Sequence, residues 1–186
     1  MIQSTLKASV GVQALHEDEV CTESFRNTLG QFATGVTVVT TLDSNGNPYG
    51  ITVSSFASLS LDPPLVQWSL RRDAYSYRVF REARCFAVNI LAAGQEDLAR
   101  RFCASIDRFH QLRIEEGLFG LPLLPDALAS IECERFGEHP GGDHAIFIGS
   151  VIRARHHAKS ALLHWQGRYH SLPQQDGSGS QHRSER

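Results

Sequence analysis

The chain has 186 residues, of which 41% are hydrophobic and 20% charged, and its formal net charge is −2. This length fits a single domain, and this composition supports a sizeable core and excludes an intrinsically disordered chain. A charge so close to zero argues against general binding to nucleic acid or to a membrane surface.

The two ends of the chain differ in composition from its middle. Residues 1–21 are mixed and acidic at 17–19, and we interpret them as a flexible leader. Residues 173–186 are rich in Gln, Ser, Gly and Arg and contain no apolar anchor, which is typical of a disordered tail. One ordered domain is therefore expected over 22–172.

The ordered part opens with a helical pattern. Thr22 can cap a helix on which Phe25, Leu29 and Phe32 follow the i, i+4, i+7 spacing of one face. Gly35 is expected to end this helix.

A run rich in β-branched residues at 36–41 predicts the first strand. Asn45-Gly46 then predicts a two-residue hairpin turn. The rest of the pattern predicts strands at 49–56, 65–70, 85–91, 129–136, 144–156 and 162–172, helices at 74–82 and 95–102, and a loop over 105–126.

Many short strands with few helices are typical of a closed or nearly closed antiparallel β-barrel. The strands do not alternate with long helices, so a doubly wound parallel sheet is disfavoured. The expected fold class is therefore mainly β, with a few short helices.

The four cysteines, Cys21, Cys85, Cys103 and Cys133, form no C-x-x-C pair, so we expect no metal site. Cys85 and Cys133 lie in apolar runs, which is typical of buried free thiols. The chain also has no apolar stretch of about 18 residues. We therefore expect a reduced, cytoplasmic protein that does not enter a membrane.

The common catalytic and nucleotide-binding motifs are absent from the sequence. We find no G-x-G-x-x-G after a strand, no P-loop, no G-x-S-x-G elbow and no H-E-x-x-H. A nucleotide would therefore have to be bound by scattered hydroxyls, backbone N–H groups and arginines.

The segment 52–60 carries five hydroxyl side chains. In a strand, Thr52 and Ser54 point to the same face. Two small hydroxyls there leave room for a flat ring or a phosphate close to the backbone. An exposed polar strand face explains the same pattern, so both interpretations stay open.

Two further features have the chemistry to contact a ligand. Basic residues are concentrated between Arg71 and Arg84, where they form either a solvent-exposed face or the rim of a site that binds phosphate. Gly141-Gly142-Asp143-His144 leads into an apolar strand. His144 is therefore expected at the mouth of that strand, within reach of a ligand or of a neighbouring loop.

Six short blocks occur in an order that resembles the short-chain flavin reductase family, which is typified by the reductase components of two-component flavin monooxygenases. The match runs from about Phe25 to Leu172. The blocks are FATGVTVVT at 32–40, GITVSSF at 50–56, SLDPPLV at 60–66, FAVNIL at 86–91, GDH at 142–144 with Ile148, Gly149 and Val151, and finally Leu163, Gly167 and Tyr169.

The resemblance implies a split β-barrel of the FMN-binding, Greek-key-like type that forms a homodimer and binds FMN or FAD near the subunit interface. It implies that His144 stands near the nicotinamide of NADH or NADPH, with Tyr169 close by. Asn89 would lie at the pyrimidine edge of the flavin, and Ser60 and Arg71 towards its phosphate. The flavin ring and its ribityl chain would be lined by Thr37, Thr52, Val53, Ser54 and Ser55.

The function that the resemblance implies is that of an NAD(P)H-dependent flavin reductase, which passes a hydride to FMN or FAD and supplies reduced flavin to a partner monooxygenase. Such a transfer needs no nucleophile and no metal, because the cofactors carry the reaction. This agrees with the missing motifs. Two alternatives stay open: a flavoprotein that reduces a metal complex or corrinoid, and a non-catalytic protein that binds flavin or haem on the same barrel.

Overall fold

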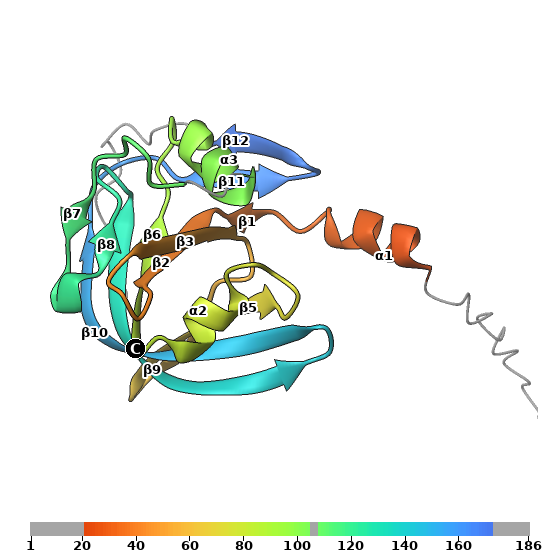
Figure 1. Ribbon diagram of the computed structural model, residues 1–186. Coiled ribbons are helices and arrows are strands. Elements are labelled where there is room, and N and C mark those ends of the chain that lie inside the picture. The colour runs from red at the N-terminus through yellow and green to blue at the C-terminus, as the bar shows by residue number, and fades with distance from the viewer. Residues whose placement is uncertain (1–20, 105–107, 173–186) are drawn as a thin grey trace, which may run out of the picture.

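The computed structural model describes residues 21–104 and 108–172 (Figure 1). The predicted tail at 173–186 and all but the last residue of the predicted leader lie outside the described residues. Within the described ranges the chain forms a curled antiparallel sheet with short helices. No helix in these ranges is long and apolar enough to cross a bilayer.

The main sheet of the described residues has seven strands in the order β3-β2-β6-β9-β10-β5-β4, and all neighbours are antiparallel. β3 and β5 also contact each other although four strands separate them in this order. The sheet therefore curls into a half-open barrel, which confirms the predicted mainly β, split-barrel class. Its strands are β2 (Thr37–Leu42), β3 (Pro48–Val53), β4 (Ala57–Leu61), β5 (Pro64–Arg71), β6 (Cys85–Ile90), β9 (Ala129–Gly141) and β10 (His144–His156).

Aromatic side chains fill the inner face of the curl. Buried and outward side chains alternate along β5, because successive side chains of a strand point to opposite faces, and Trp68 is buried at its centre. Its ring stacks on Phe147 at a centroid distance of 4.7 Å and meets Phe80 and Phe86 edge-on. Phe80 belongs to α2 (Tyr77–Glu82), which lies inside the curve of the sheet (Figure 1).

A second cluster lies under α3 (Glu96–Ala104), on the other face of the sheet. Val38 of β2 and Phe102 of α3 are fully buried in it. Gly50 allows this approach, since a Cβ there would lie 2.6 Å from the Phe102 ring. A small sheet flanks the cluster, made of β1 (Thr34–Gly35), β11 (Leu162–Trp165) and β12 (Arg168–Ser171).

The N-terminal helix forms but is shorter than predicted. α1 spans Thr22–Leu29, its N-terminus is capped by the Cys21 sulfur instead of by Thr22, and its C-cap is Gly30. The predicted end at Gly35 is wrong, because residues 34–35 pair with β11 as strand β1. This long-range pairing overrides the helical spacing of Phe32.

The hairpin between β2 and β3 also forms, but the two-residue turn is wrong. Leu42 pairs with Pro48, so the loop covers residues 43–47. The Asp43 carboxylate accepts hydrogen bonds from the backbone N–H groups of Asn45 and Asn47, each at 2.8 Å, and from the Asn47 amide at 3.0 Å. These bonds lower the pKa of Asp43 and hold the wider loop.

Several short elements were not predicted. The predicted loop at 105–126, of which 105–107 lie outside the described residues, contains β7 (Glu115–Glu116), a 3-10 turn (Leu118–Gly120) and β8 (Pro122–Leu123). β4 begins within the hydroxyl-rich segment and ends at Leu61, and the predicted strand at 162–172 is two strands joined at Gln166-Gly167. Strands of two to five residues are too short for a periodic pattern to reveal.

Gly149 of β10 lies against two core side chains. A Cβ at this position would lie 2.4 Å from Phe86 Cζ and 2.8 Å from Cys133 Cβ. We expect Gly149→Ala to lower the free energy of unfolding by about 1–3 kcal/mol, because the packed core must shift. Urea titration would measure this against Gly137→Ala, where the nearest atom is His139 Nε2 at 3.6 Å. Equal stability of the two variants would contradict the packing described.

Candidate functional site

The turn between β9 and β10 presents His144 as the first residue of β10, opposite Arg71 at the end of β5. His144 Nδ1 lies 2.7 Å from Asp143 Oδ1, and this contact lowers the pKa of the Asp143 carboxyl. The ionised carboxylate accepts a hydrogen bond from the Nδ1–H group and fixes the plane of the imidazole. The backbone N–H of Arg72 donates to the Asp143 carbonyl at 3.0 Å and ties the turn to β5. Nε2 is therefore the ring atom available to a ligand.

Ser55 lies close to this corner. Its hydroxyl donates to the Ser69 carbonyl at 3.1 Å and accepts from the Ser69 N–H at 2.9 Å. Ser69 and Arg71 share the outward face of β5, since the residues that alternate with them are buried. Arg71 lies only two residues, roughly 7 Å, beyond Ser69. The structure therefore places Ser55 on Ser69, two residues along β5 from Arg71, which pairs with His144.

The hydroxyls of Thr37 and Thr52 already have protein partners. Thr37 is buried and donates to the Val53 carbonyl at 3.0 Å, while Thr52 donates to the Ala99 carbonyl of α3 at 2.7 Å. The Val53 side chain lies in the core. β3 ends at Val53, so the predicted face shared by Thr52 and Ser54 is not continued by the strand. These residues position the backbone that leads into the segment 54–60.

Asn89 is fully buried in the sheet. Its amide nitrogen lies 3.1 Å from the Val38 carbonyl and 3.2 Å from the Thr40 hydroxyl, and its amide oxygen accepts from the Leu124 N–H at 2.9 Å. Both polar atoms are thus used within the protein. Any effect of Asn89 on a bound ring would be exerted through the placement of these neighbours.

Tyr169 packs on α3. Its ring contributes to the second cluster, and the Arg100 guanidinium carbon lies 5.1 Å from the ring centroid. Burial raises the pKa of its hydroxyl. These contacts place Tyr169 on the Thr52 side of the molecule, and no described contact joins it to His144.

Ser60 and Arg71 do not share one phosphate site within a single chain. Ser60 pairs with Leu65 near the start of β5, and Arg71 stands six residues further along the same strand, roughly 20 Å away. The Arg71 side chain pairs with Asp73 at 2.5 Å, and both groups are exposed. Such an exposed pair stabilises little, so Arg71 can turn towards a ligand.

The end of β3 and the turn between β9 and β10 lie on the same side of the barrel, from which α1 projects (Figure 1). The exposed Ser54 and Ser58 and the half-buried Ser60 lie in the segment that follows β3. Hydroxyls, backbone N–H groups and a nearby arginine match the polyol and phosphate of a flavin chain in chemical type. The donor set therefore fits a flavin, with His144 at its border.

Two residues of this corner were missed by sequence reasoning. Asp143 stands beside His144 in the quoted Gly-Asp-His block, and an adjacent carboxylate is a recognisable signal for an oriented imidazole. Ser69 carries no such signal, because a lone serine in an alternating strand matches any outward position. Its role depends on a loop that returns from β3.

These features define a split β-barrel protein with an Asp–His corner beside a hydroxyl-rich segment. Residues 29–173 match the family model described as flavin reductase like domain. The FMN reductase (NADH) SmoA of Agrobacterium fabrum is 48% identical over 133 residues, which cover 72% of this chain and 76% of that protein.

Two further relatives are also flavin reductases or reductase subunits. The reductase subunit HsaB of a flavin-dependent monooxygenase from Rhodococcus jostii is 36% identical over 161 residues, which cover 86% of this chain and 82% of that protein. The structure of the NADH:FAD oxidoreductase SgcE6 of Streptomyces globisporus matches with a TM-score of 0.79 at 38% identity, over 84% of this chain and 96% of that one. The chain belongs to the flavin reductase family.

Proposed function

We propose that this protein is an NAD(P)H:flavin oxidoreductase that reduces FMN or FAD and supplies the reduced flavin to a partner monooxygenase. The observation that carries the proposal is the Asp143–His144 pair beside Ser55 and Arg71 in a chain of this family. Relatives named as NADH-dependent FMN and FAD reductases and as monooxygenase reductase components support it.

When bound, the flavin supplies the hydride acceptor. The protein needs to hold two flat heterocycles in contact, which removes the entropic cost of their encounter. In this proposal His144 Nε2 contacts the nicotinamide, and Asp143 fixes the ring that carries it. The segment 54–60 holds the polyol and phosphate, and its anchor is the double hydrogen bond between Ser55 and Ser69.

We further propose that two copies form a homodimer. α1 has no buried residue, and Phe25 and Leu29 on this helix are 53% and 55% exposed. Phe32, three residues beyond its end, is 76% exposed. Leu61, at the end of edge strand β4, is 92% exposed. A second copy of the same chain, seated on α1 and β4 beside the candidate site, would cover these apolar groups.

The proposed compartment is the reducing cytoplasm. All four thiols of the chain are free, which fits a reducing environment. Cys133 is buried, as predicted, whereas Cys85 is only half-buried. Burial raises the pKa of the Cys133 thiol to about 12, so this group stays protonated and unreactive at neutral pH.

An anaerobic titration with NADH and with NADPH, each in the presence of FMN or FAD, tests the proposed function. We expect stoichiometric bleaching of added free flavin for at least one of the four combinations. Bleaching confined to a flavin that copurifies with the protein would favour reduction of another acceptor. No bleaching in any combination would contradict the proposal.

A further inference from the structure

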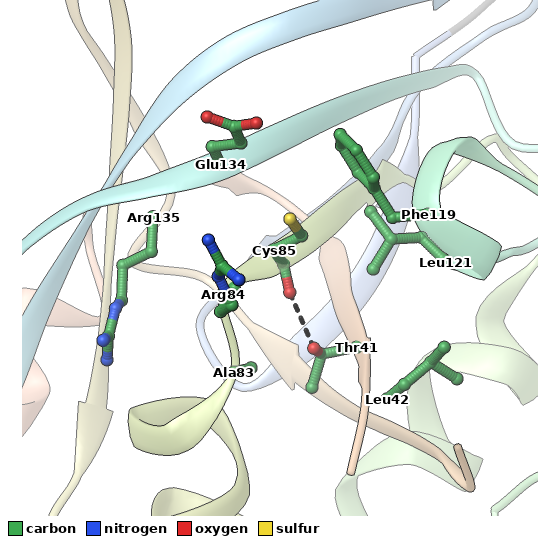
Figure 2. A pocket seen from close by; sticks show the side chains of 9 residues that line it. All are labelled: Thr41, Leu42, Ala83, Arg84, Cys85, Phe119, Leu121, Glu134 and Arg135. Carbon is green, nitrogen blue, oxygen red and sulfur yellow. Dashed lines mark hydrogen bonds between the residues drawn. The ribbon is translucent and has the colours of Figure 1, made fainter. Parts of the chain in front are cut away.

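A cavity of about 580 Å3 opens on the barrel away from the candidate flavin site. It lies beyond Thr41 and Cys85, whereas Thr37 stands four residues, roughly 13 Å, back along β2. Its volume falls in the range of small-molecule sites. Figure 2 shows the nine lining residues, which are Thr41, Leu42, Ala83, Arg84, Cys85, Phe119, Leu121, Glu134 and Arg135.

One wall of this cavity carries an unpaired cation. Within the described residues, no hydrogen bond or ion pair engages the Arg84 guanidinium, which extends towards the hollow (Figure 2). The Arg135 guanidinium donates instead to the Arg81 carbonyl and points away from Phe119 (Figure 2). Arg84 is therefore the cation of the lining that can receive an anion, and the ligand must keep its charge on the Arg84 side, away from the Glu134 carboxylate that also lines the cavity.

The facing wall is apolar and shaped by the backbone. Phe119 is 60% exposed, although it is a large aromatic residue, and its φ of 59° lies in the left-handed region. Leu121 is buried beside it, and the Cys85 thiol lies between Arg84 and this wall (Figure 2). A non-glycine residue is held in this strained conformation only where the surrounding structure offsets the strain.

A buried carboxylate holds this wall in place. Glu132 is 1% exposed and accepts a hydrogen bond from the Leu118 N–H, next to Phe119. A Cβ at Gly117 would lie 2.6 Å from Glu132 Oε2, so glycine is required there. The Gly117 N–H also donates to the Leu121 carbonyl at 2.8 Å. The phenyl ring is thus preorganised at the mouth of the cavity.

We propose that this cavity is a binding site for a small aromatic carboxylate. The carboxylate pairs with the Arg84 guanidinium, whose fork geometry suits two parallel hydrogen bonds. The aromatic ring lies against Phe119 and Leu121, above the Cys85 thiol, where aromatic and sulfur contacts are both favourable. None of these residues belongs to the candidate flavin site.

Benzoate is the probe that tests the proposal. We expect saturable benzoate binding to the full chain by calorimetry, with backbone amide shifts at Arg84, Cys85 and residues 118–121 in NMR spectra. Acetate, which lacks the ring, and benzyl alcohol, which lacks the charge, should bind at least about tenfold more weakly. Flavin reduction should not be required for binding.

Two variants keep the proposal falsifiable. Arg84→Gln should weaken benzoate binding about tenfold or more. Phe119→Gly relieves the left-handed backbone and removes the ring, so the fold should persist while affinity falls roughly threefold to tenfold. The matched control is Gln166→Gly, which makes the same change at a remote residue with φ of 48° and should leave affinity unchanged. Unchanged binding in Arg84→Gln, or amide shifts centred on Ser55 and His144, would overturn the proposal.

Discussion

Replacing His144 with alanine is expected to lower kcat/KM for the nicotinamide about ten- to a hundredfold, while flavin affinity changes less than about twofold. The loss corresponds to one hydrogen bond of roughly 1.5–3 kcal/mol made by an oriented imidazole. Flavin affinity should persist because the segment 54–60, anchored by Ser55 on Ser69, is untouched. Steady-state kinetics with varied nicotinamide and a separate flavin titration measure the two effects.

Two further variants sharpen this experiment. Asp143→Asn keeps the imidazole but weakens its anchor, so it should show a smaller loss in the same parameter. His139→Ala removes an exposed histidine of β9 and should leave both parameters unchanged. A His144→Ala enzyme that lost flavin affinity but kept its nicotinamide kinetics would contradict the proposed role.

Replacing Glu132 with glutamine is expected to lower the free energy of unfolding by about 2–4 kcal/mol. The Glu132 carboxylate is almost fully buried and accepts from Arg153 Nε at 2.5 Å and Nη2 at 2.7 Å. Removing one partner of a buried pair costs about 3–5 kcal/mol. The expected loss is smaller than this, because the Arg153 side chain is 37% exposed and its guanidinium can be solvated by water once the carboxylate is gone.

The same variant should change how stability depends on pH. Burial by itself raises the pKa of Glu132, but the hydrogen bonds from Arg153 and Leu118 and the nearby arginine charges hold it below its usual value. The stabilisation is therefore complete above the unfolded-state pKa of about 4 and is lost as pH falls through the lower folded-state pKa. The stability gap between wild type and Glu132→Gln should thus narrow in acid.

Glu134→Gln is the matched control, because Glu134 is an exposed carboxylate on the same strand. Its effect on the free energy of unfolding should stay within about 0.5 kcal/mol. Chemical denaturation of the three proteins at neutral and acidic pH measures all of these effects. If the Glu132→Gln protein were as stable as the Glu134→Gln protein, the buried ion pair between Glu132 and Arg153 would make no net contribution to the free energy of unfolding.

Long strands with regular patterns could be predicted from the sequence. The alternation around Trp68 indicates β5, because successive side chains of a strand point to opposite faces of the sheet. The run of β-branched residues at 36–41 indicates β2, which is buried on both faces. The five-residue loop at 43–47 could not be predicted, because it depends on which backbone N–H groups donate hydrogen bonds to the Asp43 carboxylate. The ion pair of Glu132 forms with Arg153, which faces it across the β9–β10 hairpin, and this pairing cannot be read from a local sequence pattern.

The candidate site was predicted in part. His144 stands at the mouth of its strand as expected, and its orientation by Asp143 follows from adjacency in the sequence. The hydroxyls of Thr37 and Thr52 looked equally available, but each has a backbone partner that only the folded chain supplies. A strand hydroxyl can donate to a backbone carbonyl of the protein or bind a ligand. Which of the two it does depends on the elements that pack against it in the folded chain.

In the proposed reaction a hydride passes directly between two rings held beside His144, and anaerobic single-turnover mixing with nicotinamide deuterated at C4 follows this transfer itself. We expect added flavin to bleach in step with nicotinamide oxidation, deuteration to slow the bleaching, and His144→Ala to slow it further. Bleaching at the same rate with either isotope and with either protein would contradict it.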